Sequence, residues 1–153
     1  MADTVSKERR SWNMSRIQGK DTAIEVKVRK YLFHHGFRYR KNVRQLPGTP
    51  DIVLRKYNTA IFVHGCFWHQ HPFCRYASTP KSNTEYWDKK LSHNVEKDKS
   101  QISKLESLGW HVIVIWECEL KKENFEITMQ RVINELEETY VSQRSRELHH
   151  ADR

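Results

Sequence analysis

Apolar residues recur with two different spacings along the chain, and the alternation of these spacings predicts a mixed α/β fold. Apolar positions three or four residues apart predict helices. The first helix is followed by Gly36 and the second by Gly109, the residue type that commonly ends a helix. The second is either one long helix or two broken ones, and residues 141–153 are expected to fray as a tail. The predicted helices span residues 22–35, 84–108 and 122–140.

Shorter apolar runs fill the intervals between the helices and predict strands. Residues 37–43 alternate between apolar and polar side chains, whereas 110–116 is apolar on both faces and is predicted to be a central strand buried between layers. The predicted strands span residues 37–43, 51–55, 59–64 and 110–116. The resulting order predicts an α/β fold, a three-layer sandwich with a mixed central sheet. Many metal-dependent nucleases share this layout, although a fold alone does not assign a function.

One domain over residues 11–140 accounts for all of these elements, because a chain of 153 residues can bury a substantial core. Residues 1–10 are polar and charged without an apolar period, and we expect a flexible basic arm there. The segment 11–20 is predicted to be either a short helix that caps the core or a basic arm that lies in a nucleic-acid groove. No apolar run approaches the length of a membrane span.

The charge of the chain narrows the class of its partners. Lysine and arginine total 27 against 19 acidic residues, which gives a net charge of +8 and a pI near 9.5. Such an excess favours a polyanionic partner, nucleic acid first and an acidic membrane second. The five tryptophans strengthen the first alternative, since exposed aromatic rings beside cations are used to stack on bases.

The segment that follows the third predicted strand has the spacing of a zinc site. Cys66, His71 and Cys74 lie close together in sequence, and Cys118 follows the last apolar run. Taken singly, such residues are more often ordinary core or surface residues. Together they make a Cys3His set, whereas a disulfide would leave one thiol over, and the sequence shows no secretory signal that would imply an oxidising compartment. We therefore predict a structural zinc site, for which His69 fits nearly as well as His71.

Asp51 is a candidate magnesium ligand on the basis of strand register. If the turn between the second and third strands is centred on Tyr57, antiparallel pairing places Asp51 opposite Val63 and beside His64. The alternative is that Asp51 caps backbone amides at the start of its strand. Glu25 has a simpler interpretation, because it lies three residues after Thr22, where a capping-box acid is expected.

Several short strings along residues 11–120 occur in the order that is typical of one known family. They are Asn13-Met14, Asp21-Thr22-Ala23-Ile24-Glu25, Leu46-Pro47-Gly48-Thr49-Pro50-Asp51, His64-Gly65-Cys66-Phe67-Trp68-His69, Asn94-Val95-Glu96-Lys97-Asp98, Gly109-Trp110 and Ile115-Trp116-Glu117-Cys118. In these strings the chain resembles the very-short-patch repair endonucleases. The resemblance implies a fold similar to that of type II restriction endonucleases. It also implies an enzyme that nicks DNA 5′ of the thymine in T·G mismatches left by deamination of 5-methylcytosine.

The resemblance also implies roles for individual residues. Asp51 and the backbone carbonyl of Val63 would bind Mg²⁺, His69 would be the general base, and His64 and Glu25 would support the site. The implied zinc ligands are Cys66, His71, Cys74 and Cys118. The implied DNA contacts are Met14 from the minor groove, Phe67, Trp68 and Trp87 in the base stack, and Lys90 and Asn94. The gap before Cys74 varies between one and two residues in the family, so the tip of this loop is expected to differ among members.

The sequence therefore predicts a monomeric, magnesium-dependent and zinc-stabilised endonuclease that acts on duplex DNA containing a T·G mismatch and initiates very short patch repair. Its expected location is the bacterial cytoplasm, with association to the nucleoid while it acts. General mismatch-repair factors are candidate accessory partners. Two alternatives remain open: a non-catalytic zinc module that binds DNA, and a nuclease of the same fold without mismatch preference.

Overall fold

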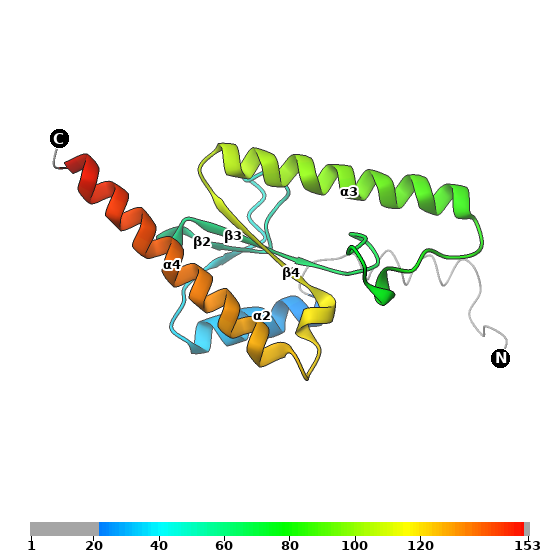
Figure 1. Cartoon of the computed structure of the whole chain (residues 1–153), viewed down its shortest axis with the longest axis horizontal. Helices are drawn as coiled ribbons and strands as arrows, with labels where there is room; N and C mark the ends of the chain where they lie inside the picture. Colours follow the sequence, from blue (N-terminus) through cyan, green and yellow to red (C-terminus); the bar gives the residue numbers. More distant parts are fainter. Residues whose placement is uncertain (1–21, 152–153) are drawn as a thin grey trace.

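The computed structural model describes residues 22–151 of the chain (Figure 1). The predicted arm at residues 1–10, the segment 11–20 and Met14 lie outside these described residues. In the described part, no helix is long and apolar enough to cross a membrane.

The order of helices and strands matches the prediction. The elements are α2 (Ala23–His34), β1 (Arg40–Lys41), β2 (Ile52–Leu54), η1 (Arg55–Tyr57), β3 (Thr59–His64), η2 (Arg75–Ala77), α3 (Thr84–Ser107), β4 (His111–Trp116), η3 (Glu117–Leu120) and α4 (Phe125–Ala151). The second helix is a single unbroken α3 of 24 residues. The predicted end of the last helix near residue 140 is wrong. α4 continues as a helix to Ala151, through most of the tail that was expected to fray.

The four described strands form one mixed sheet in the order β1-β2-β3-β4. β1, β2 and β3 pair antiparallel, whereas β3 and β4 pair parallel, with α3 as the connection between them. All six residues of β3 are buried, so β3 is the central strand. The prediction that 110–116 is central is wrong within the described sheet. β4 lies at its edge, and its side chains on the α3 face are only half-buried.

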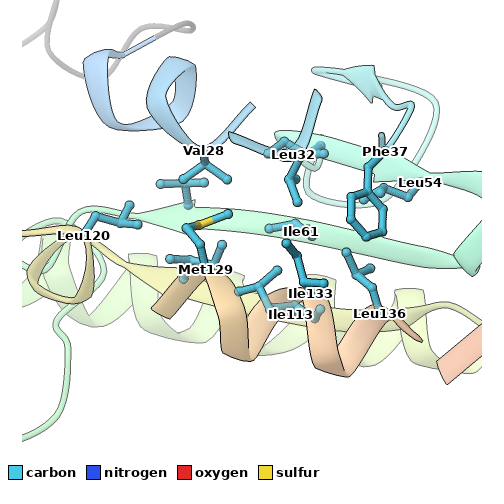
Figure 2. Close-up of a cluster of buried hydrophobic side chains, with 14 residues drawn as sticks. Val28, Leu32, Phe37, Leu54, Ile61, Ile113, Leu120, Met129, Ile133 and Leu136 are labelled. Atoms are coloured by element: carbon cyan, nitrogen blue, oxygen red, sulfur yellow. The ribbon is translucent and has the colours of Figure 1, made fainter. Parts of the chain in front are cut away.

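Helices cover both faces of the sheet, which gives the three layers that the sequence predicts (Figure 1). Side chains of α2, the sheet and α4 meet on one face in the larger cluster of buried residues, as Figure 2 shows. A smaller cluster on the opposite face joins Ala60 and Phe62 of β3 to Leu105 of α3. The predicted strand 37–43 is reduced to the two residues of β1. Phe37 precedes it and packs into the larger cluster, and Asn42 directly after it is left-handed with φ of 51°.

The register of the β2–β3 hairpin differs from the predicted one by a single residue. Leu54 pairs with Thr59, so the loop holds the four residues 55–58, and its centre lies between Lys56 and Tyr57. Extending this pairing places Asp51 level with Phe62 rather than with Val63. Asn58, which ends the loop, takes a left-handed conformation with φ of 50°. The shift leaves Asp51 at the predicted rim of the sheet, where the active-site candidates gather.

Candidate active site and zinc centre

The loop that leads to Asp51 lies against α3 and requires a glycine. Gly48 has φ of +77°, and a Cβ atom there would lie 3.0 Å from Gln101 Oε1 and 3.1 Å from a ring carbon of Phe62. Both the backbone conformation and the close approach exclude a larger side chain. The Leu46–Asp51 string thus fixes the path by which Asp51 reaches the end of the sheet.

Asp51 is anchored to the neighbouring strand. The backbone N–H of Val63 donates a hydrogen bond of 2.7 Å to Asp51 Oδ2. Burial raises the pKa of Asp51 from 3.8 to about 6, and the negative charge of Glu25 adds to the rise, whereas the Val63 N–H, His69 and Arg29 act in the opposite direction. In an antiparallel pair the N–H and C=O of one residue point to the same side. The carbonyl of Val63 is therefore expected on the same side of β3 as Asp51.

Glu25 and Arg29 form a buried ion pair beside Asp51. Both side chains project from α2, four residues apart, with Arg29 Nη1 at 3.7 Å from Glu25 Oε2. The N-terminus of α2 is capped by Thr22, whose hydroxyl accepts a hydrogen bond of 3.5 Å from the Glu25 N–H. The Thr22 half of the predicted capping box is therefore present. Glu25 is only 7% exposed, which is rare for an acid without a functional or paired role.

His69 is oriented by a carboxylate from α3. His69 Nδ1 lies 2.6 Å from Asp98 Oδ2, and since an ionised carboxylate can only accept, Nδ1 carries the proton. The other ring nitrogen, Nε2, then has a free lone pair and can accept a proton. The prediction assigned no role to Asp98, although the sequence held a signal for it. The position continues the inward stripe of Leu91, Val95, Ile102 and Leu105, where an acid is unexpected.

His64 packs face to face with His69. Their ring centroids are 3.8 Å apart and the rings are inclined by only 4°. Burial, and next the proximity of His69, lowers the pKa of His64 to about 4, so this ring is neutral at physiological pH. Its Nδ1 is buried and has no hydrogen-bond partner among the described residues.

The ligand atoms of His64, His69 and Asp98 also lie within 4.8 Å of one another, close enough in distance for a metal ion. The stacking argues against that use. A metal bound to imidazole lies near the ring plane, along the nitrogen lone pair, and two parallel rings 3.8 Å apart share no such point. Asp98 is moreover engaged with His69 Nδ1. We therefore regard these residues as a proton-transfer group.

The predicted zinc ligands gather where the two parallel strands β3 and β4 end, since Cys66 follows β3 and Cys118 follows β4. Cys66, His71, Cys74 and Cys118 place one ligand atom each within 4.8 Å of the others. His71 Nδ1 lies 3.7 Å from Cys66 Sγ and 3.3 Å from Cys118 Sγ. A tetrahedral zinc ion with ordinary bond lengths separates sulfur and nitrogen ligands by about 3.6 Å. The four residues therefore fit zinc, with His71 rather than His69 in the set.

The surroundings of this Cys3His group support a closed structural site. His71 stacks on Trp116 with 4.2 Å between ring centroids, and the backbone N–H of Cys118 donates to Cys66 Sγ at 3.4 Å. All three cysteines are free thiols. Burial raises the pKa of the Cys66 thiol to about 12, so a metal ion that binds there must displace its proton.

Three aromatic side chains that the prediction assigned to DNA form one cluster, which we call the aromatic wedge: Phe67, Trp68 and Trp87. Ring centroids are 5.0 Å apart for Phe67 and Trp68, 5.5 Å for Phe67 and Trp87, and 5.9 Å for Trp68 and Trp87. All three are only half-buried. Phe67 and Trp68 lie on the loop of residues 65–74, which we call the zinc-ligand loop, and Trp87 lies in the first turn of α3. The wedge therefore joins this loop to α3.

The two remaining described candidates for DNA contact lie on α3 behind the wedge. Asn94 Nδ2 donates a hydrogen bond of 3.0 Å to the backbone oxygen of Trp68, so its amide fixes the base of the wedge. Lys90 is half-buried on the same helix. Of the predicted site residues, the structure brings together Asp51, His64 and His69 with Glu25 nearby, and it assembles the zinc ligands and the wedge as two adjoining groups.

Comparisons with known proteins agree with this arrangement. The family model described as DNA mismatch endonuclease Vsr matches residues 2–75. A type II nicking enzyme of Neisseria meningitidis is 50% identical over 121 residues, which cover 79% of this chain and 86% of that protein. The DNA mismatch endonuclease Vsr of Escherichia coli is 42% identical over 138 residues, which cover 90% of this chain and 87% of that protein. A type II nicking enzyme of Xanthomonas oryzae is 43% identical over 120 residues, which cover 78% of this chain and 88% of that protein. The chain belongs to the Vsr family of DNA mismatch endonucleases.

Proposed function

We propose that this protein is a strand-specific endonuclease that nicks DNA 5′ of the thymine in T·G mismatches by magnesium-dependent hydrolysis, and thereby initiates very short patch repair. The observation that carries the proposal is the position of His69. It is paired with Asp98 at 2.6 Å on one side, and its loop also carries Trp68 of the wedge. A proton acceptor and two residues of the wedge on one loop would couple recognition to cleavage.

The carboxylate end of the site has the donors that magnesium prefers. Asp51 and the Val63 carbonyl are hard oxygen ligands, and Glu25 lies near enough to affect the pKa of Asp51. A bound Mg²⁺ would neutralise charge on the scissile phosphate and hold water beside it. Asp51 and Val63 would hold the ion, while Arg29 keeps the carboxylate of Glu25 in place through their ion pair.

Proton transfer falls to His69. The Asp98 carboxylate holds the Nδ1–H, so Nε2 accepts the proton of the attacking water, and the positive ring that results is stabilised by Asp98. His64 cannot share the charge, because burial keeps it neutral, and it serves as the flat surface against which the His69 ring is held.

Recognition of the mismatch follows from the cost of opening a base step. A T·G pair stacks and pairs less well than T·A, so the insertion of aromatic side chains costs less free energy there. Phe67 and Trp68 of the wedge lie on the loop that carries Cys66 and His71, and a zinc ion bound there would keep this loop rigid. The protein would act as a monomer on duplex DNA in the bacterial cytoplasm.

The test is a nicking assay on a duplex with a single T·G pair and on its T·A counterpart, each with and without Mg²⁺. We expect cleavage only of the T·G duplex and only with Mg²⁺, and none from Asp51→Ala. A protein that binds T·G duplexes but never cleaves them would instead be a DNA-binding zinc module. Equal cleavage of both duplexes would indicate a nuclease without mismatch preference.

A further inference from the structure

The tip of the zinc-ligand loop carries an aromatic side chain with no role in the fold. Phe73 is fully exposed, at 109% of its reference area, and takes part in no ring contact among the described residues. Its backbone has φ of 57°, a left-handed conformation that costs free energy for a residue other than glycine. Neither feature stabilises the native state, so both indicate a contact that the isolated chain does not make.

Phe73 lies at a loop tip that a bound metal would restrain. The residue lies between two predicted zinc ligands, His71 and Cys74, so a zinc ion held by them would restrain the chain on both sides of it. Gln70, at the start of the same tip, is also left-handed with φ of 48°, and its amide donates to the backbone oxygen of Phe67 at 2.6 Å. A restrained aromatic ring loses little conformational entropy when it binds a partner.

The surroundings of Phe73 in sequence carry positive charge. Tyr76, 40% exposed, has the Arg75 guanidinium 4.9 Å and the Lys121 ammonium 4.8 Å from its ring centroid. Exposed aromatic rings together with cations match a nucleic-acid strand, whose bases stack and whose phosphates are anionic. A hollow beside Tyr76 is bordered by the cations Arg75 and Lys121 and by two acids, Glu119 and Glu123. The Glu119 carboxylate is held by Arg131 at 2.7 Å and by the Trp116 N–H at 3.0 Å, so Glu123 is the acid that lies against the two cations.

The aromatic wedge is continuous with this group along the chain. Phe67 and Trp68 lie a few residues before Phe73 on the same loop. The segment after Tyr76 leads to α3 (Figure 1), whose first turn carries Trp87. The five residues that follow Trp68, up to Phe73, span at most about 18 Å, which is within the reach of a duplex seated on the wedge. A protein surface would also accept aromatic and basic side chains, but the continuity with the wedge and the charge of +8 favour DNA.

We propose that Phe73, with Arg75 and Tyr76, forms a second DNA contact that binds the duplex to one side of the mismatch and adds affinity without adding mismatch selectivity. The inference rests on the proposed function, because it takes duplex DNA as the substrate. The proposed contact at Phe73 differs from the wedge in a measurable way. Removal of a wedge residue reduces binding to T·G DNA selectively, whereas removal of Phe73 reduces binding to matched and mismatched duplexes alike.

The experiment measures equilibrium binding of the full-length, zinc-loaded protein to T·G and T·A duplexes at one salt concentration, without magnesium so that no cleavage occurs. We expect Phe73→Ala to weaken binding to both duplexes by about fivefold or more, the loss typical of truncating an aromatic side chain that is buried at an interface, with their affinity ratio unchanged. Phe73→Leu, which keeps the bulk but not the ring, should bind with an affinity between those of the wild type and Phe73→Ala. Phe33→Ala removes a half-exposed phenylalanine from α2 and serves as the matched control, with no effect expected.

Duplexes shortened from either end locate the contact. The loss caused by Phe73→Ala should disappear when the DNA is cut back on one side of the mismatch and persist when it is cut back on the other. Affinity within twofold of the wild type on long duplexes would overturn the proposal. So would a loss confined to T·G DNA, which would place Phe73 in the wedge, or one accompanied by zinc release or a lower melting temperature. If the wild type itself shows no T·G preference, the proposed function fails, while the effect of Phe73 on both duplexes is still measured.

Discussion

Replacement of Asp51 by asparagine should stabilise the folded protein in the absence of magnesium while abolishing cleavage. The carboxyl group is buried, and its pKa rises from 3.8 to about 6 on folding. An acid whose folded pKa is raised favours the native state in its protonated form. This contribution to the free energy of unfolding is fully present below about pH 4 and is lost as the pH rises through 6. Asparagine keeps an oxygen that can accept the Val63 N–H but carries no charge.

The size of the effect follows from the two pKa values. A rise from 3.8 to about 6 corresponds to about 3 kcal/mol of unfolding free energy at pH 8. Asp51→Asn should therefore be more stable than the wild type by about 1–3 kcal/mol at pH 8 and nearly equal to it at pH 4.

Urea denaturation at the two pH values, in magnesium-free buffer without a chelator that would strip zinc, measures this difference. Asp88→Asn, which removes an exposed acid from α3, is the control and should show no such pH-dependent gain. Added Mg²⁺ should stabilise the wild type and not Asp51→Asn. A variant that is less stable than the wild type at pH 8 would refute the reasoning, because the buried carboxylate would then stabilise the fold through its hydrogen bond.

Four further substitutions test the other parts of the site. Cys118→Ser should lose zinc and unfold or aggregate, since the metal joins the ends of two strands; a zinc-free protein with a normal melting curve would contradict this. His69→Ala should keep its affinity for T·G DNA within a few-fold but nick about 10²–10⁴-fold more slowly in single turnovers, and Asp98→Asn should slow the same step with unchanged binding, because it leaves His69 without its anionic partner. Trp68→Ala should weaken binding to the T·G duplex by about 1–3 kcal/mol and barely change binding to the T·A duplex; equal losses on both would place selectivity elsewhere.

The parts of the site that the sequence predicts best are local. Cys66, His71 and Cys74 lie within one short loop, so their spacing alone predicts a metal site. Asp98 was missed for the opposite reason. It comes from the middle of α3, and only the packing of that helix on the sheet brings it to His69. In the sequence, such a contact is indicated only by an acidic residue at a position of the helix where an apolar one is expected.

The errors in the fold have equally specific causes. The hairpin register depends on whether its loop holds three or four residues, and the 3₁₀ turn η1 with a left-handed Asn58 makes it four. The edge position of β4 could not be inferred from its composition, because valines that face a long helix resemble those of a strand buried on both sides. The length of α4 was underestimated because its last turns extend beyond the apolar positions that pack on the sheet.

The separation of the zinc ligands along the chain has a consequence for biosynthesis. Cys66 follows β3 and Cys118 follows β4, and all of α3 lies between them. While the ribosome is still making α3, the nascent chain already holds Asp51, His69 and Trp68, but it lacks Cys118, the fourth zinc ligand, and the strand that delivers it. Contacts between residues so far apart in sequence form late in folding. We therefore expect the loop that bears the wedge and His69 to become rigid only after β4 has docked on β3, so a partly synthesised or misfolded copy cannot nick the genome.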